Sequence, residues 1–169
     1  SLTMILQPDV SPPHDSELER MLVSQGMQSR EAFSDAAEIL PSEDRFHDYA
    51  CRTLWRTMRE LHGRGEPWDL QLLAAHLNQT GQLVDVGGYV GLSEIYSKAI
   101  ATVTATNYAE RVHDLWLLRS MANAGVSMHR DAMERAEGTP AELRAKYERE
   151  IFALGESGAV GKPITSKEL

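Results

Sequence analysis

The side chains in this sequence that come nearest to a metal site are His47 and Cys51, which stand four positions apart. On a helix this spacing places two side chains on one face, where two metal ligands can come together. A metal site needs further ligands, and the chain has no second pair of the kind found in an H-E-x-x-H motif. We therefore interpret Cys51 as a core thiol beside a surface imidazole, and the sequence predicts no metal site.

A glycine-rich segment near the end of the chain is similar to a loop that binds phosphate groups. It reads Gly155-Glu-Ser-Gly158-Ala-Val-Gly161-Lys162. A phosphate-binding loop needs G-x-x-x-x-G-K-[ST] after a strand, so that backbone amides and the lysine hold the phosphates. Here the spacing from Gly155 to Gly161 is one residue too long, Pro163 replaces the hydroxyl that would bind magnesium, and a helical pattern precedes the segment. We expect no nucleotide site here.

Other catalytic arrangements are also without support. The chain has no G-x-S-x-G motif that would mark an activated serine. Trp68, Tyr89 and Trp116 could stack on the bases of a single strand, but they lack basic neighbours, so we interpret them as core or protein-contact aromatics. The sequence predicts no catalytic residue and no cofactor in this chain.

Composition and charge restrict the class of protein further. The chain has 169 residues, of which 42% are hydrophobic, and this is enough for one core. It carries 17 basic and 25 acidic residues, a net charge of −8, so its average surface would repel a phosphate backbone. The basic runs 52–59, 111–119 and 144–149 are interleaved with apolar or acidic residues, as solvated helix faces are. We expect little direct binding to DNA.

Cysteine usage and hydropathy indicate the cellular compartment. The single cysteine excludes an internal disulfide and fits a reducing cytosol. No apolar run approaches the roughly 18 residues that are needed to span a bilayer. We expect a cytoplasmic protein with no membrane partner.

The periodicity of the apolar residues predicts an all-α fold, in which a globular helical bundle is followed by a long antiparallel helical hairpin. No segment has a convincing strand pattern. The first helix starts near Asp15 or Ser16, either of which can cap free backbone amides. The second helix covers residues 30–40, where Pro41 stops it.

Three further helices complete the expected bundle. Ser42 is expected to cap a longer helix that runs to about His62. The inward stripe of this helix consists of Phe46, Ala50, Leu54, Met58 and Leu61. Asp69 caps a shorter helix, for which Gly81 supplies a left-handed end. The pair Gly87-Gly88 precedes the last helix of the bundle.

From about Thr106 the pattern changes to a repeat of seven residues, which predicts one long helix. The repeated positions are Tyr108, Leu115, Ala122, His129 and Ala136, with Leu118, Gly125 and Ala132 at the companion positions. A second apolar face consists of Val112, Leu117, Met121 and Met128. A helix that is apolar on two sides must bury both. We expect Gly138 to end this helix.

A complete helix-start signal follows. Thr139 can cap, Pro140 takes the first helical position, where its missing N–H costs nothing, and Glu142 can reach back as in a capping box. The apolar stripe of this next helix is Leu143, Tyr147, Ile151 and Leu154. The two helices form a hairpin of roughly 45 residues that offers a large face to a second copy of the chain. In the simpler alternative the hairpin packs on its own globular body, but Ala122 and Gly125 would permit close approach of another helix.

These patterns divide the chain into parts with different roles. The segment from Thr165 to Glu168 is similar to a capping box whose helix is cut off at Leu169, so we expect the chain to be a fragment. The expected parts are a flexible N-terminal arm (1–11), a globular helical head (12–104), a helical hairpin of the same domain used for dimerisation (105–155), and the start of a linker (156–169).

An ordered set of motifs between Pro12 and Glu156 resembles one known family, the amino-terminal domains of bacterial replicative DNA helicases of the DnaB type. The opening Pro12-Pro13-His14 with Glu17 and Glu19 is similar to the family's P-P-H-x-x-E-x-E. The matching elements of the head are Asp69-Leu70 (I-D-L) and Leu77, Gly81-Gln82-Leu83 and Gly87-Gly88-Tyr89 (L-x-x-x-G-x-L-x-x-x-G-G-aromatic). Those of the hairpin are Tyr108-Ala109, Val112 and Leu118-Arg119.

The chain departs from the family pattern at a few positions. Cys51 stands where the family usually has His, and Gly91 stands where an aromatic residue is common. These departures concern single side chains and leave the order and spacing of the motifs intact.

The resemblance implies an assembly module without a motor. In that family hairpins pair two subunits, three such pairs form a collar on a hexameric helicase, and the C-terminal domain of primase docks on the collar. A RecA-like domain, which uses ATP and Mg to unwind DNA, would follow the linker and is absent from this chain. A helicase loader is a further candidate partner, and the implied location is the nucleoid in the cytoplasm.

The resemblance also indicates where contacts would lie. The expected subunit or primase interface consists of Tyr108, Leu115, Leu118, Ala122, Gly125, Leu143, Tyr147 and Ile151. Two alternatives from other classes stay open. The chain could be a stand-alone helical adaptor or helicase-loading accessory protein that kept the domain without the motor, or it could be a small helical enzyme.

Overall fold

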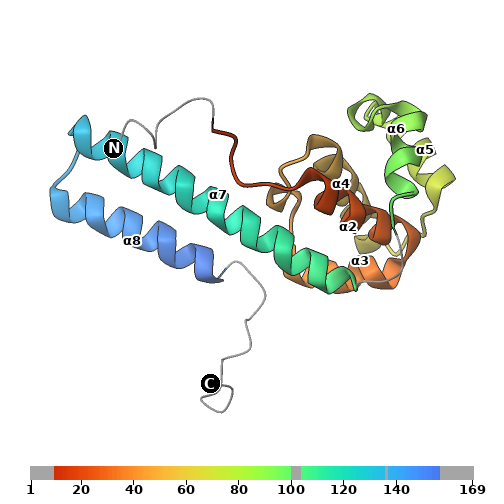
Figure 1. Ribbon diagram of the computed structural model, residues 1–169, viewed down its shortest axis with the longest axis horizontal. Helices are drawn as coiled ribbons and strands as arrows, with labels where there is room; N and C mark the ends of the chain where they lie inside the picture. Colours follow the sequence, from red (N-terminus) through yellow and green to blue (C-terminus); the bar gives the residue numbers. More distant parts are fainter. Residues whose placement is uncertain (1–9, 100–103, 136, 157–169) are drawn as a thin grey trace, which may run out of the picture. The chain divides into compact units, whose positions relative to one another are not determined.

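The computed structural model describes residues 10–99, 104–135 and 137–156, and helices are its only regular elements there (Figure 1). In chain order they are α2 (Ser16–Gln28), α3 (Arg30–Ile39), η1 (Glu43–Arg45), α4 (Tyr49–Gly63), α5 (Leu70–Gln79), η2 (Leu83–Val86), α6 (Gly88–Tyr96), α7 (Ala105–Met133) and α8 (Pro140–Glu156). The predicted all-α fold, a helical bundle followed by a long antiparallel hairpin, is confirmed.

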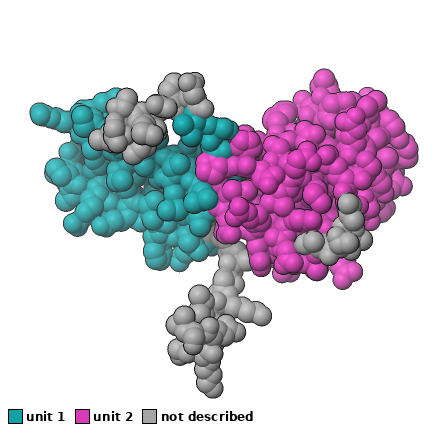
Figure 2. Space-filling model, viewed as in Figure 1, with its two compact units in different colours: residues 1–12, 117–169 teal, residues 13–116 magenta. Residues whose placement is uncertain are grey.

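The chain divides into two compact units, which Figure 2 shows in different colours. One unit is Pro13–Trp116, which we call the head, and the other consists of Ser1–Pro12 with Leu117–Leu169. The first part of α7 therefore belongs to the head, where Ala105, Ala109 and Val112 join the hydrophobic core.

Short polar side chains begin four of the helices of the head. Asp15 Oδ1 accepts a hydrogen bond from the N–H of Leu18 at 3.0 Å, and Asp69 Oδ1 accepts one from Leu72 at 2.8 Å. These two caps confirm the predicted starts of α2 and α5. Ser29 and Asp48 cap α3 and α4 in the same way.

The predicted start of the third helix at Ser42 is wrong. The helix α4 begins at Tyr49, and Ser42 precedes only the short 3₁₀ turn η1, where its side chain does not cap the backbone. The reason lies in Glu19 of α2, whose carboxylate accepts the N–H groups of His47 at 2.5 Å and Asp48 at 2.9 Å. Because these two N–H groups are engaged by a side chain of another helix, Asp48 becomes the first residue that can cap α4.

The core of the head is built around Trp55. Its ring centroid lies 4.8 Å from that of Phe33 and 4.9 Å from that of Phe46, and all three side chains are buried. The indole N–H donates to the carbonyl oxygen of Leu40 at 3.0 Å, so this large side chain is buried without losing a hydrogen bond. The inward stripe predicted for this helix is buried, including Phe46, which precedes the helix itself.

Ser24 links α2, the first helix of the head, to the end of α6. Its hydroxyl donates to the carbonyl oxygen of Tyr96 at 2.6 Å and accepts the N–H of Ala99 at 2.9 Å. The same Tyr96 oxygen accepts a second hydrogen bond from Gln28 at 2.6 Å. In this Ser24 contact, side chains of α2 therefore form hydrogen bonds with backbone groups at the end of α6, which have no partner within their own helix.

The sequence predicts the start of α8 correctly but not the end of α7. The helix α7 stops at Met133, so the prediction that it continues to Gly138 is wrong, because Arg135 already takes up a left-handed conformation (φ 51°). The start of α8 is as predicted. Glu142 accepts the N–H of Thr139 at 2.9 Å, and Thr139 Oγ1 accepts the N–H of Glu142 at 3.2 Å, which is a complete capping box.

Several expectations fall at the ends of the chain. The flexible arm (1–11), the linker (156–169) and the second capping box lie almost entirely outside the described residues. The last turn of α8 includes Gly155, so a helix does precede the glycine-rich segment. Among the described helices, none is long and apolar enough to cross a membrane.

Candidate interaction surface

A groove of about 440 Å³ lies between the two helices of the hairpin. Its lining consists of Ser120, Asn123, Ala124 and Ser127 from α7 with Glu150, Ala153 and Leu154 from α8. Leu154 is the one large apolar side chain among these residues.

Asp131 holds the hairpin together near its turn. Its carboxylate accepts hydrogen bonds from the hydroxyl of Tyr147 and from Lys146 Nζ, the latter at 3.3 Å. The hydrogen bond from Tyr147 and then the contact with Lys146 lower the pKa of Asp131, and the same bond raises the pKa of the Tyr147 hydroxyl. This acid is thus charged at neutral pH and links α7 to α8.

Several large apolar side chains of the hairpin lie outside the groove and are exposed. The exposed fractions are Leu118 49%, Met121 48%, Val126 40%, Met128 47% and Met133 72% on α7, and Ile151 46% and Phe152 70% on α8. The sequence predicts that both apolar faces of α7 are buried. Within the chain this holds only for the first part of α7, where Val112 is buried. The rest forms an uncovered apolar surface, which we call the hairpin face.

Gly125 lies in the middle of this exposed part of α7. A Cβ atom added to it would meet no other atom of the chain within 4 Å. Glycine in the interior of a helix costs about 1 kcal/mol relative to alanine. Nothing within the chain itself explains a glycine at this position.

The eight residues that the sequence indicated as an interface do not all lie on one surface. Tyr108 packs against the core of the head and Leu115 is buried. Leu118, Ala122, Gly125 and Ile151 are exposed on the hairpin, while Leu143 is half-buried and Tyr147 is buried. Four of the eight therefore line the exposed hairpin face.

Sequence reasoning missed two residues of the hairpin. Phe152 is strongly exposed, and its aromatic side chain one position after Ile151 was the available signal. Asp131 could not be recognised from the sequence, because an acidic residue in a helix is normally expected on the face exposed to solvent.

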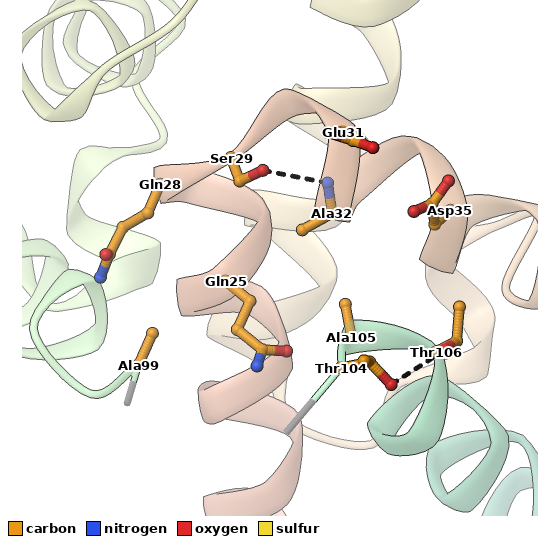
Figure 3. Close-up of a pocket in the computed structure, with 10 residues that line it drawn as sticks. All are labelled: Gln25, Gln28, Ser29, Glu31, Ala32, Asp35, Ala99, Thr104, Ala105 and Thr106. Carbon is orange, nitrogen blue, oxygen red and sulfur yellow. Dashed lines mark hydrogen bonds between the residues drawn. The ribbon is translucent and has the colours of Figure 1, made fainter. Parts of the chain in front are cut away.

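A cavity of about 510 Å³ in the head lies between the end of α2, the start of α3 and the start of α7 (Figure 3). Its lining residues are Gln25, Gln28, Ser29, Glu31, Ala32, Asp35, Ala99, Thr104, Ala105 and Thr106. None of these is a histidine, cysteine, lysine or arginine, and the Ser29 hydroxyl already caps α3 at 3.1 Å. The ionisable groups among these lining residues are the carboxyl groups of Glu31 and Asp35, which by themselves do not define a reaction.

Both tryptophans that could have stacked on nucleic-acid bases are engaged inside the head. Trp68 packs edge-on against Phe33, and its indole N–H donates to the carbonyl oxygen of Gly26 at 3.1 Å. The guanidinium of Arg45 lies 3.8 Å from the centre of the Trp116 ring, and His113 stacks on that ring at 5.5 Å. This agrees with their interpretation as protein-contact aromatics.

Cys51 and His47, the two candidate metal ligands, lie in different surroundings. Cys51 is fully buried, and burial, followed by the charges of Asp48 and Glu19, raises the pKa of its thiol well above the ordinary value. His47 is exposed and stacks on His14, with 4.1 Å between the ring centres. Their interpretation as a core thiol and a surface imidazole is confirmed.

His113 makes the stability of the head depend on pH. Burial lowers the pKa of its imidazole below the ordinary 6.5, although Asp114 partly offsets this, and Arg45 lowers the pKa further. The unfolded chain therefore binds a proton more readily than the folded chain below about pH 6.5. We expect the free energy of unfolding to fall as the pH drops through this range.

The measurement is urea unfolding between about pH 5 and pH 8 for the native chain and His113→Phe. The phenyl ring keeps the stack on Trp116 but cannot take up a proton. The difference in unfolding free energy between the native chain and His113→Phe should be constant above about pH 7. Below about pH 6.5 the native chain should lose more stability than the variant, because only the native chain can take up a proton at position 113. Parallel curves over the whole range would contradict a role for His113.

The sequence of the head matches a known family. The family described as DnaB-like helicase N-terminal domain matches residues 11–114. The chain belongs to this family. As a DnaB-like N-terminal domain, it is similar to curated relatives over much of its length. It is 32% identical over 146 residues to the replicative DNA helicase DnaB of Mycobacterium leprae (strain TN), and 27% identical over 149 residues to that of Synechocystis sp. (strain ATCC 27184 / PCC 6803 / Kazusa).

This DnaB-like domain is shorter than those relatives. The alignments cover 86% of the chain in both cases, but only 24% and 16% of the two relatives. Its fold matches the crystal structure of the N-terminal domain of DnaB helicase from Mycobacterium tuberculosis, with a TM-score of 0.77 and 30% identity over 85% of this chain and 99% of that one. A DnaB-like replicative helicase whose structure is described with its interactions with primase shares the fold at a TM-score of 0.69 and 18% identity, over 89% of this chain and 33% of that one.

Proposed function

We propose that this chain is the amino-terminal assembly domain of a replicative DNA helicase, and that its α7–α8 hairpin pairs with the hairpin of a second copy. The observation that carries this proposal is the hairpin face, where large apolar side chains of both helices are exposed. Exposed contiguous apolar surface on a protein marks a site of interaction, because burying it is favourable. A second copy of the same face is the simplest partner that supplies matching apolar side chains.

Two details of the hairpin support pairing over packing on another part of the same chain. Gly125 leaves open space around its Cα, so a partner helix could approach α7 closely there. The groove between α7 and α8 is lined mainly by small and polar side chains, with Leu154 as the exception, while Leu118, Met121 and Met128 of α7 are exposed. Pairing of two hairpins would add the apolar core that one hairpin lacks.

The wider role follows from membership of the family. In the parent protein, three such pairs would form the collar of a hexameric ring, and the collar would receive the C-terminal domain of primase and a helicase loader. The described interactions of a related helicase with primase support this proposal. Unwinding of DNA would belong to a RecA-like motor domain that uses ATP and Mg, and this domain would contribute assembly without a cofactor of its own.

Sedimentation of the purified chain tests the pairing. We expect dimers at high micromolar concentration, and we expect the double variant Leu118→Glu/Ile151→Glu to raise the dissociation constant at least about a hundredfold. The reason is that each carboxylate would have to leave water in the paired state. The variant should keep its helical content, because both positions are exposed in the single chain.

Val90→Glu is the matched control. It places the same charge at an exposed apolar position of the head, in α6, and should leave the dissociation constant unchanged. A native chain that stays monomeric at high micromolar concentration would refute pairing by the hairpin.

Adding the C-terminal domain of the cognate primase to the same assay tests the docking of primase.

A further inference from the structure

The thioether side chains that the structure describes fall into two groups. Met27 and Met58 are buried in the core of the head, and Met21 is half-buried. Met121, Met128 and Met133 are exposed on α7. Met121 and Met128 are seven residues apart, so they lie on the same side of the helix. All three exposed methionines are part of the hairpin face.

The cysteine does not compete with these methionines for an oxidant. The Cys51 side chain has no exposed surface, and its raised pKa keeps it a thiol, whereas the thiolate is the form that reacts. A peroxide that meets the folded, unpaired chain therefore reaches the thioethers of α7 before the thiol. Exposure and the chemical softness of sulfur therefore select Met121, Met128 and Met133.

We infer that Met121, Met128 and Met133 are oxidation sites through which peroxides weaken the pairing of the hairpins. This inference rests on the proposed pairing. A peroxide transfers one oxygen atom to the thioether sulfur, so that the O–O bond breaks and an S–O bond forms. The sulfur loses two electrons, and hydrogen peroxide leaves as water. The product is a methionine sulfoxide, which is polar where the thioether was apolar.

The sulfoxide acts against pairing by a simple route. Its oxygen is a strong hydrogen-bond acceptor, and the apolar side chains around it, such as Leu118, cannot supply a donor. Burying an unsatisfied polar group is unfavourable, so the oxidised chain stays unpaired. Reaction takes place on the unpaired chain, where the sulfur atoms are exposed, and it draws the equilibrium away from the dimer.

The experiment uses the whole chain and hydrogen peroxide. Mass spectrometry of peptides locates the added oxygen, circular dichroism checks the helical content, and sedimentation measures the dissociation constant before and after treatment. For the native chain we expect one oxygen on each of Met121, Met128 and Met133 and a rise in the dissociation constant of at least about tenfold.

Two variants serve as matched controls. Met121→Leu/Met128→Leu/Met133→Leu keeps the size and apolar character of the side chains but removes the exposed sulfur atoms of α7, so it should pair like the native chain and ignore peroxide. Met21→Leu removes a half-buried thioether of the head and should leave the response unchanged.

The outcomes separate this inference from the proposed function. A native chain that pairs, takes up oxygen at these three positions and keeps its dissociation constant would overturn the inference and leave pairing intact. An equal loss of pairing by the leucine variant in peroxide would also overturn it. A native chain that does not pair before treatment would refute the proposed pairing and the inference together.

Discussion

Replacing Glu19 by alanine is expected to lower the free energy of unfolding by about 3 kcal/mol. The Glu19 carboxylate is buried and accepts the N–H groups of His47 and Asp48. Alanine would leave two backbone donors without an acceptor at the point where the chain enters α4. Glu19→Gln should cost less, because the amide oxygen can still accept one N–H while its NH₂ group cannot accept the other.

Glu17→Ala is the control for this result. Glu17 is in the same first turn of α2, but its side chain is 73% exposed and forms an ion pair with Lys98 at 2.9 Å. An exposed pair of this kind contributes less than about 1 kcal/mol. Urea unfolding at one low protein concentration compares the variants, because association would add to the measured stability. Equal losses for Glu19→Ala and Glu17→Ala would show that the two buried hydrogen bonds contribute nothing.

The second large effect is expected at Gly91, where alanine should also cost about 3 kcal/mol. A Cβ atom on this residue would lie 2.2 Å from the carbonyl oxygen of Val86. Neither atom is at the flexible end of a side chain, so η2 and α6 must move apart.

Gly125→Ala is the matched control, since it makes the same change within a helix. There the added Cβ would meet nothing within 4 Å, and alanine favours the helix by about 1 kcal/mol. The two substitutions should therefore change the free energy of unfolding of the single chain in opposite directions. If Gly91→Ala unfolds at the same urea concentration as the native chain, the contact with Val86 is not restrictive.

Helix starts could be predicted from the sequence wherever the responsible groups are close in the chain. Asp15, Asp69 and Thr139 each bond a backbone N–H three residues later, so the pattern contains both partners. The failure at Ser42 has the opposite cause. The conformation before α4 depends on Glu19, which lies 28 residues before His47, and no local pattern contains that contact.

The interface could be predicted only in outline. Periodicity identified the apolar faces of the long helix, but it could not decide which part of each face the chain covers by itself. The first part, with Leu115, lies in the head, whereas the later part, with Leu118, is exposed. The contact between Asp131 and Tyr147 depends on how α8 is aligned with α7, and the turn between them sets that alignment.

The Ser24 contact also has a consequence for the time at which the protein becomes complete. Ser24 and Tyr96 are separated by 72 residues, so the first helix leaves the ribosome long before its partner exists. At roughly 5–20 residues per second, that interval lasts several seconds. The part of α2 that packs on α6 therefore stays uncovered during this interval, although α3 follows α2 directly and can pack on it much earlier. The capping box at Thr139 needs only three further residues, so the turn of the hairpin can form as soon as it is synthesised.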